Sequence, residues 1–299
     1  MRIALCQYAP ERGDLAGNLA RSLEWLERAG EAGADLAILP ELCTTGYTLG
    51  DGFLDAAQPV PGPATDAWGR VARKYGMDVI GGLARRHPHM ESIVYNSAVY
   101  VDREGAVRAV HDKVILPLYL HTWLGEGEAV VIEEPEIFRH GDRIRAFDTR
   151  FGRVGMLVCQ DAVYPEYTRE MALQGARLVV HILNGPAVQT RHEEDITPET
   201  TRVHAFDNGV FIALCNRVGR ERFEWHGREF TAEFYGASHV CDPLGNFVAK
   251  GPAREEALVT ADVDLESVAR AQWSMKLLRD WRPELLRSFR EGDDPFYRA

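Results

Sequence analysis

The sequence predicts an α/β fold, and three observations support this prediction. Short apolar runs of the length of buried strands recur from one end of the chain to the other. Segments with helical periodicity alternate with several of these runs, which is typical of α/β proteins. Apolar residues make up 45% of the 299 positions, which is enough to build a large core.

The first half of the chain contains four predicted strands and two predicted helices. The strands are expected at residues 2–8, 35–40, 78–83 and 95–102. The first helix follows the first strand, because Asp14 can cap it and four leucines share one helical face: Leu15, Leu19, Leu23 and Leu26. A second helix is expected at 65–75.

The second half repeats the alternation of strands and helices. Strands are expected at 143–148, 152–159, 178–183, 210–216, 237–242 and 257–262. Helices are expected at 166–174 and 198–208. Turn residues at 100–105 and 241–246 separate strand-like segments and predict two hairpins.

The chain shows no linker and no low-complexity segment, so residues 1–299 are expected to form a single domain. The last stretch, 265–299, is rich in Arg, Trp and Leu but lacks a strand pattern. We expect a C-terminal helix and arm there, packed on the body or at a subunit interface.

The charge, the apolar runs and the cysteines of the sequence limit the partners and the compartment that can be expected. Lys and Arg number 34 against 45 Asp and Glu, and the net charge of −11 argues against nucleic acid or an anionic membrane as the main partner. No apolar run approaches the ~20 residues of a membrane span, and the N-terminus lacks a signal-peptide core. The five cysteines are scattered and odd in number, so we expect a cytoplasmic protein with reduced thiols.

Two charged residues lie in apolar surroundings. Glu41 directly follows the apolar segment 35–40, at the strand end where α/β sheets place their sites, although a surface or helix-start glutamate would look the same. Lys113 lies among Val110, Val114 and other apolar residues. Such a lysine either extends to water or is buried with a carboxylate, for which Glu41 is a candidate.

The stretch GMLVCQDAVYPE places Cys159 at the end of an apolar strand and before a helix that begins near Pro165. A thiol in this position can be exposed, with backbone N–H groups nearby that stabilise an anion. The alternative is a core cysteine, the usual fate of a thiol without a disulfide. We expect that fate for Cys6, Cys43, Cys215 and Cys241.

Taken together, these segments resemble the nitrilase superfamily of carbon–nitrogen hydrolases over nearly the whole chain. Its three catalytic patterns appear in order as Leu-Pro-Glu at 39–41, Lys-x-x-Leu-Pro at 113–117, and Gly-x-x-x-Cys-x-Asp-x-x-x-Pro-Glu at 155–166. The segment EEPEIFRHGD resembles the family region that carries a second glutamate, which maps to Glu134. Segments 183–187, 202–219, 235–249 and 279–285 resemble further family landmarks.

The resemblance implies a four-layer α–β–β–α sandwich whose subunits pair into a homodimer or a higher homo-oligomer, and it implies no cofactor and no metal. It assigns the nucleophile to Cys159, the proton carrier to Glu41, and the oxyanion donors to Lys113 and the Gln160 N–H, with Glu134 orienting Lys113 or the substrate. The implied reaction is hydrolysis of a non-peptide C–N bond in a small amide or N-carbamoyl (ureido) compound. It releases ammonia through a thioester or carbamoyl-enzyme.

Substrate contacts are expected from six residues near these motifs: Tyr47, Gln160, Tyr164, Asn184, His121 and Trp123. Many relatives carry an aromatic residue directly after the cysteine, whereas this chain has Gln160. A polar side chain there can add a hydrogen bond to the substrate, so we expect it to influence specificity.

Other functions remain open at this point. The same triad would serve a nitrilase that acts on a small nitrile, and a nitrilase-like fold can also belong to a catalytically silent interaction protein. A Cys–His hydrolase could use His111, His121, His181 or His204, but no local signature supports it. A metal site at His87 and His89 is disfavoured, because no cysteine or carboxylate lies at ligand spacing around that turn.

Overall fold

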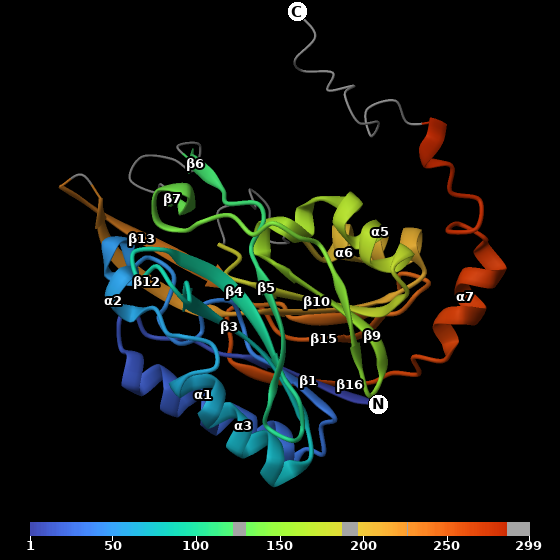
Figure 1. Cartoon of the computed structure of the whole chain (residues 1–299), viewed down its shortest axis with the longest axis horizontal. Coiled ribbons are helices and arrows are strands. Elements are labelled where there is room, and N and C mark those ends of the chain that lie inside the picture. The colour runs from blue at the N-terminus through green and yellow to red at the C-terminus, as the bar shows by residue number, and fades with distance from the viewer. Residues whose placement is uncertain (122–129, 187–196, 226, 286–299) are drawn as a thin grey trace, which may run out of the picture.

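The computed structural model describes residues 1–121, 130–186, 197–225 and 227–285. Two six-stranded sheets pack face to face, and helices cover both outer faces (Figure 1). The predicted four-layer α–β–β–α architecture is therefore confirmed.

The first sheet has the strand order β16-β1-β2-β3-β4-β5. Strands β1, β2 and β3 are parallel, whereas β4, β5 and β16 join antiparallel to their neighbours. Its strands are β1 (Arg2–Gln7), β2 (Leu36–Ile38), β3 (Asp78–Arg86), β4 (Val94–Val101), β5 (Val107–Asp112) and β16 (Ala257–Asp262).

The second sheet has the order β15-β14-β11-β10-β9-β8, with β9, β10 and β11 parallel. Its strands are β8 (Ala146–Thr149), β9 (Gly152–Val158), β10 (Ala176–Leu183), β11 (Phe211–Asn216), β14 (His239–Cys241) and β15 (Phe247–Lys250). Two small two-stranded sheets lie beside the main pair: β6 (Leu118–His121) with β7 (Val130–Glu133), and β12 (Val218–Trp225) with β13 (Arg228–Tyr235).

Strand β1 shows how the sequence produces the layers. Ile3 and Leu5 face the second sheet in the central core, whereas Ala4 and Cys6 point the other way, toward the helices. This alternation follows from the two-residue repeat of a strand. Both faces of the strand are apolar because both are covered.

Two helices cover each sheet. Helices α1 (Leu15–Glu31) and α3 (Pro63–Tyr75) pack on the first sheet, and α5 (Pro165–Leu173) and α6 (Thr197–Asn208) pack on the second. The predicted cap is confirmed, because Asp14 accepts a hydrogen bond from the Gly17 N–H at the start of α1. The shorter helices are α2 (Phe53–Ala56), α4 (Glu134–Ile137) and α7 (Ser267–Met275), with 3-10 helices at Gly50–Gly52, Cys159–Val163 and Pro283–Leu285.

All ten predicted strands and five predicted helices are present, with ends that differ by a few residues. The hairpin turns are also confirmed, since Gly105 and Gly245 close the β4–β5 and β14–β15 connections. Strands β6, β7, β12 and β13 were not predicted, and β5 and β15 were expected only as the second arms of the two hairpins, without bounds.

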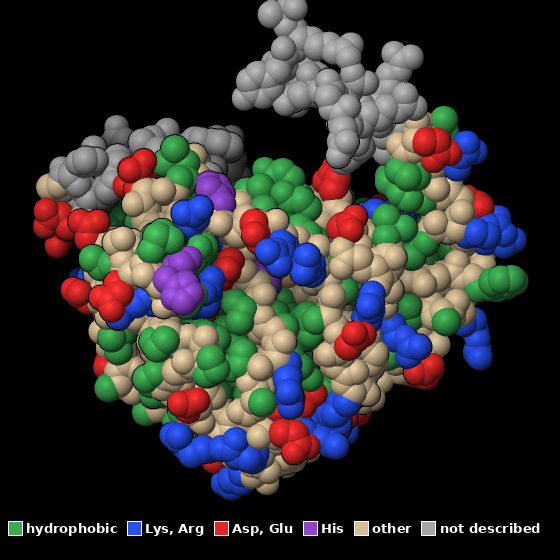
Figure 2. All heavy atoms as spheres, viewed as in Figure 1, with side chains coloured by type: hydrophobic (Ala, Val, Ile, Leu, Met, Phe, Trp, Pro, Cys, Tyr) green, Lys and Arg blue, Asp and Glu red, His purple; other side chains and the backbone are tan. Residues whose placement is uncertain are grey.

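Two further features concern the charge of the surface and the character of the helices. On the face shown in Figure 2, acidic and basic side chains are interspersed rather than gathered into one patch of a single sign. Among the helices of the described residues, none is long and apolar enough to cross a membrane.

Candidate active site

Three charged side chains meet in the interior, close to the carboxyl ends of strands from both sheets. Lys113 directly follows β5, Glu41 comes after β2, and Glu134 opens α4. Lys113 Nζ donates to Glu41 Oε1 at 3.0 Å and to Glu134 Oε1 at 2.6 Å. Because all three side chains are buried, the lysine bridges two carboxylates out of contact with bulk water.

Glu41 is fixed by donors on both of its oxygens. Asn96 Nδ2 of β4 donates to Oε1 at 2.6 Å, and the backbone N–H of Asn184, just after β10, donates to Oε2 at 2.6 Å. The turn around Glu41 also lies against β3, where a Cβ on Gly82 would come within 2.6 Å of the Glu41 Cα. Gly82 therefore permits the close backbone approach that places this carboxylate.

Glu134 has an asymmetric environment. Its Oε1 accepts from Lys113 and from the Tyr47 hydroxyl at 2.7 Å, whereas its Oε2 has no hydrogen-bond partner among the described residues. Burial raises the pKa of Glu134 to about 7, Lys113 opposes this rise, and the charge of Glu41 adds to it. The side chain can therefore gain or lose a proton near neutral pH.

Lys113 is a cation held by its partners. Burial alone would lower its pKa, but the charges of Glu134 and Glu41 outweigh this effect and raise the pKa well above that of a free lysine. A positive charge in the interior needs such partners, because an isolated buried charge is strongly unfavourable.

Cys159 differs from the other four cysteines. It begins the 3-10 helix that follows β9 and has a φ of +47°, a left-handed backbone conformation that is uncommon outside glycine. It is partly exposed, whereas Cys6, Cys43, Cys215 and Cys241 are buried as expected.

The charges around Cys159 determine its protonation. Burial of the sulfur and the charges of Glu41 and Glu134 raise the pKa of this thiol, whereas Lys113 and the Asn184 N–H lower it. The net effect is a pKa above that of a free cysteine, so the resting group is a thiol. Cys159 would therefore need a base to become a nucleophile.

Asp161 connects the cysteine turn to the lysine turn. Its buried carboxylate accepts from the backbone N–H groups of Val114 and Ile115 at 3.0 and 2.8 Å, and it bonds His111 Nε2 at 2.9 Å. The two residues that follow Lys113 are thus tied to a residue two positions after Cys159. No pattern in the sequence had identified this role.

Residues 2–272 match the family described as carbon-nitrogen hydrolase. The chain belongs to this family. The family resemblance and the α/β fold predicted from the sequence are therefore both confirmed.

Named relatives resemble this chain along most of its length. It is 28% identical to a probable nitrilase of Schizosaccharomyces pombe, over 88% of this chain and 89% of the relative. It is 27% identical to N-carbamoylputrescine amidase of Solanum lycopersicum, over 95% and 92% of the two chains. These relatives support a hydrolase with amidase-like activity.

A solved amidase from Nesterenkonia sp. AN1 has a similar structure. Two structures of its variants each superpose with a TM-score of 0.75 at 25% identity, covering 97% of both chains. One is a complex with acrylamide, and the other shows the acetamide moiety of fluoroacetamide added covalently at the active-site cysteine.

The structure brings some of the predicted substrate contacts to the cluster. Tyr47 bonds Glu134, and Asn184 lies beside Glu41 with both atoms of its buried side-chain amide lacking partners among the described residues. Gln160 is partly buried next to the cysteine. Tyr164 instead stacks its half-exposed ring on Tyr167 of α5 at 5.5 Å.

Two predicted contacts lie outside the described part of the site. His121 ends β6, but its side chain is not among the described side chains, and Trp123 lies outside the described residues altogether.

Three of the candidate histidines lie in settings other than a Cys–His pair or a metal site. His111 bonds Asp161, and His181 lies on the opposite face of β10 from the central core. His87 Nδ1 accepts hydrogen bonds from the backbone N–H groups of His89 and Met90 in its own turn. Across the described ranges, no three His, Cys, Asp or Glu side chains are grouped to hold a metal ion.

Proposed function

We propose that the protein hydrolyses the C–N bond of a small amide or N-carbamoyl compound and releases ammonia, with Cys159 as the nucleophile. The observation that carries this proposal is the buried Glu41–Lys113–Glu134 cluster beside the one cysteine that is not fully buried. A thiol, a carboxylate and a fixed cation can supply the nucleophile, the base and the oxyanion stabilisation for acyl transfer from an amide.

Glu41 serves as the base in the first step. It takes the Cys159 proton as Sγ forms a bond to the substrate carbonyl carbon, and the carbonyl oxygen gains negative charge. Lys113 can stabilise that oxygen because two carboxylates hold it in place before the substrate arrives. The backbone N–H of Gln160 provides a second donor, and one such donor is typically worth ~3 kcal/mol.

The same carboxyl group completes the cycle. Glu41 returns its proton to the leaving nitrogen as the C–N bond breaks, which leaves a thioester on Cys159. Water then attacks the thioester while Glu41 accepts a proton from it, and Glu41 passes this proton to Sγ as the C–S bond breaks, which releases the acid and regenerates the thiol. A ureido substrate would leave a carbamoyl-enzyme, whose hydrolysis gives a carbamate that decomposes to carbon dioxide and ammonia.

Substrate recognition is assigned to residues around the cluster. The Asn184 side-chain amide offers an NH₂ donor group and an acceptor oxygen, which match the carbonyl oxygen and the NH₂ group of a primary amide or ureido group. Gln160 adds a polar group directly beside the nucleophile. Tyr47, Tyr164, His121 and Trp123 are kept as candidate contacts from the sequence.

The chain is further proposed to act as a single domain that pairs into a homodimer or larger homo-oligomer, with residues 265–299 at a subunit interface. The five cysteines without disulfides are compatible with a reducing compartment such as the cytoplasm.

A substrate panel with variant enzymes tests this function. The wild type is incubated with amides, ureido compounds and nitriles while ammonia is followed, and Cys159 is examined by mass spectrometry for an added acyl or carbamoyl group. Cys159→Ala, Glu41→Gln and Lys113→Ala should each abolish turnover. The exposed residues Glu136 and Lys250 provide controls, and Glu136→Gln and Lys250→Ala should leave it unchanged.

The outcomes separate the alternatives. Near wild-type turnover in any of the three site variants would refute the assignment of roles. Ammonia from nitriles alone would identify a nitrilase. A wild type that acts on no compound, and whose Cys159 reacts with iodoacetamide no faster than Cys6, would indicate a silent interaction protein.

A further inference from the structure

The turn that carries Tyr47 is held by a buried carboxylate on another part of the chain. Glu221 of β12 accepts from the Tyr47 N–H at 3.0 Å, from the Thr48 N–H at 2.8 Å and from the Thr48 hydroxyl at 2.8 Å. Its charge is balanced by the buried guanidinium of Arg217, with which it forms an ion pair.

Arg217 is itself immobilised. It donates to the Pro10 carbonyl at 2.8 Å, and its guanidinium lies 4.1 Å above the Phe234 ring. Phe234 in turn meets the Tyr47 ring edge-on at 6.1 Å between centroids. The backbone and the ring of Tyr47 are therefore both fixed by groups of the β12–β13 region.

Gly46 provides an independent sign of how closely Glu221 approaches this turn. A Cβ at Gly46 would lie 2.8 Å from Glu221 Oε1 and 3.0 Å from the Arg12 Cα, and the residue has a φ of +79°. Gly50, which begins the following 3-10 helix, also has a positive φ, of +58°, but a Cβ there would meet nothing within 4 Å. The glycine at position 46 thus leaves room for the carboxylate as well as allowing the turn.

We propose that Glu221 is a positioning residue for the reaction, acting through Tyr47. By holding the backbone amides of Tyr47 and Thr48, it directs the Tyr47 hydroxyl to Glu134 Oε1, the oxygen that also accepts from Lys113. The series Glu221–Tyr47–Glu134–Lys113 therefore links β12 to the cation that would stabilise the oxyanion. This inference rests on the proposed function of the site.

The pKa of Glu134 should show whether Glu221 acts on the site through Tyr47. The Tyr47 hydroxyl favours the ionised form of Glu134, and the other site groups that act on it are Lys113 and Glu41. A second set of charged groups lines the cavity of about 280 Å³ beside Glu134: Arg12, Asp51, Glu133 and Glu224. Loss of the hydroxyl contact should raise the pKa of Glu134 and move the acid limb of kcat/KM to higher pH.

A double-mutant cycle tests the inference. Tyr47→Phe and Glu221→Gln should each lower kcat on the order of tenfold with little change in KM, and each should shift the acid limb upward. The double variant should be no slower than the slower single variant, because Glu221 is proposed to act only through the Tyr47–Glu134 contact that Tyr47→Phe removes. Additive losses, or an unshifted acid limb in Glu221→Gln, would overturn the inference.

A second pair of variants covers the case in which Glu221→Gln does not fold. Gly46→Ala and Gly50→Ala both place a side chain at a positive φ, but only the first places a methyl group against Glu221, with the Arg12 backbone as its second close neighbour. Gly46→Ala should reproduce the shifted acid limb, and Gly50→Ala should not. Equal effects would show that Glu221 has only a structural role.

The same cycle can be measured without a substrate, as the rate at which iodoacetamide alkylates Cys159 at several pH values. The single variants should change that rate alike, and the double variant should change it no further. Failure of the proposed function would appear in the wild type, which would release no ammonia. Failure of the present inference would appear only in the variants.

Discussion

At the scale of single residues, the site combines one cation with two carboxylates in a volume that excludes bulk water. Burial disfavours the charged form of the Glu134 carboxyl group, Lys113 opposes this effect, and the charge of Glu41 adds to it. Glu134 shows the consequence, because its pKa rises to about 7. The charge of Glu134, and therefore its electrostatic attraction for Lys113, should change within the physiological pH range.

This leads to a prediction about the pH dependence of activity. Below pH 7, Glu134 gains a proton and its attraction for Lys113 weakens, so kcat/KM should fall as the pH decreases. Glu134→Gln should remove this limb and reduce kcat at pH 8 on the order of tenfold to a hundredfold, because Lys113 loses one anchor. Steady-state rates between pH 5 and 9 would check it.

The matched control for Glu134 is Glu136→Gln, an exposed position on the same short helix. This variant should keep the wild-type profile. If Glu134→Gln also kept the acid limb near pH 7, another group would be responsible for it.

At the scale of elements, the positions of Lys113 and Cys159 depend on strands from different sheets, β5 and β9. Asp161 links the ends of these two strands directly. Its carboxylate accepts hydrogen bonds from the two backbone N–H groups that follow Lys113 and from the Val158 N–H at 3.3 Å. A carboxylate with several backbone donors is difficult to replace, since an amide presents a donor where an acceptor is needed.

Asp161→Asn should therefore lower kcat by roughly a hundredfold, because a displacement of about 1 Å between reacting groups can cost that much. It should also lower the free energy of unfolding by about 1–3 kcal/mol, the cost of leaving a buried polar group without its partner. Kinetics and urea denaturation measure the two effects. Asp148→Asn, at an exposed aspartate, should change neither quantity, and a fully active Asp161→Asn would contradict the anchoring role.

A second element-scale feature is the buried His181 on β10. Neither ring nitrogen has a partner among the described residues, and burial lowers the pKa of His181 to about 3, with His204 and His239 adding to the effect. An unfolded chain takes up the proton near pH 6.5, whereas the folded chain resists it. The free energy of unfolding is therefore unaffected by His181 above pH 6.5. It decreases as the pH falls from 6.5 toward 3, because protonation of His181 stabilises the unfolded chain.

At pH 5 the loss should be roughly 2 kcal/mol relative to pH 8, from the 1.36 kcal/mol that each pH unit contributes. His181→Leu should remove this part of the acid sensitivity, which thermal or urea unfolding at the two pH values would measure. His89→Gln, at an exposed histidine, should retain it. An unchanged pH dependence in His181→Leu would show that His181 is not the source.

At the scale of the whole molecule, local patterns were sufficient to predict most strands and helices, whereas the four layers and the candidate catalytic residues followed from the family resemblance, which itself rests on short motifs. Apolar strands such as β10 are continuous runs, and Glu41, Lys113 and Cys159 each lie within a short motif. The network around them was not predictable in this way. Asp161 and Glu221 act on residues that are 46 and 174 positions away in the chain, and no local pattern records such pairs.

The missed strands have a similar explanation. Strand β13 alternates buried Phe230, Ala232 and Phe234 with polar residues, a two-residue period that the charged residues between them obscured. Strand β5 lies at a sheet edge and alternates partly buried with exposed residues along its first half. Strands with one exposed face give a weaker apolar signal than strands covered on both faces.

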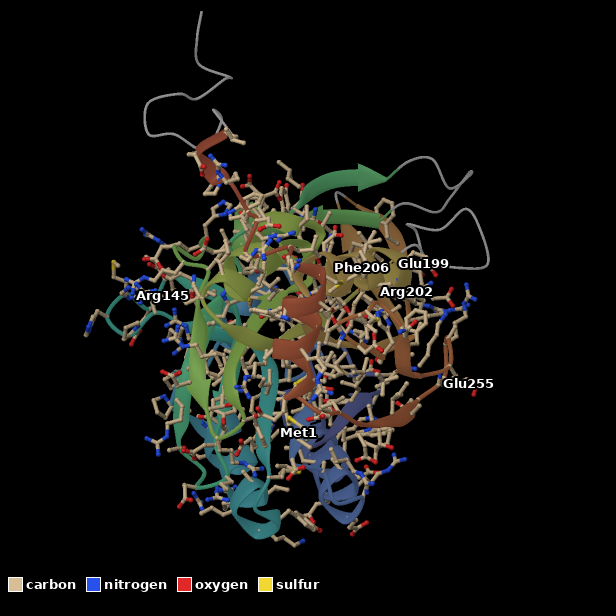
Figure 3. The ribbon with its side chains drawn as sticks, turned by 90° about the vertical axis from the view of Figure 1, so that its right-hand side faces the viewer. Met1, Arg145, Glu199, Arg202, Phe206 and Glu255 are labelled. Carbon is tan, nitrogen blue, oxygen red and sulfur yellow. The ribbon has the colours of Figure 1, made fainter. Side chains whose placement is uncertain are left out.

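The last prediction concerns the proposed pairing of subunits. Helix α6 exposes Val203 and Phe206 at 54% and 45%, and Trp273 of α7 is 77% exposed. Figure 3 looks onto α7 and shows Phe206 on the same side of the molecule. A pairing surface needs about 800 Å² on each partner, and exposed aromatic residues of this kind are enriched in such surfaces.

Phe206→Glu and Trp273→Glu should therefore shift a dimer or larger oligomer toward the monomer in light scattering, because each introduces a charge into an apolar contact. Met90→Glu, at an equally exposed methionine in the turn before β4, should leave the assembly intact. A wild type that is monomeric and fully active would rule out the pairing. An assembly that survives both α6 and α7 variants would place the interface on a different face of the protein.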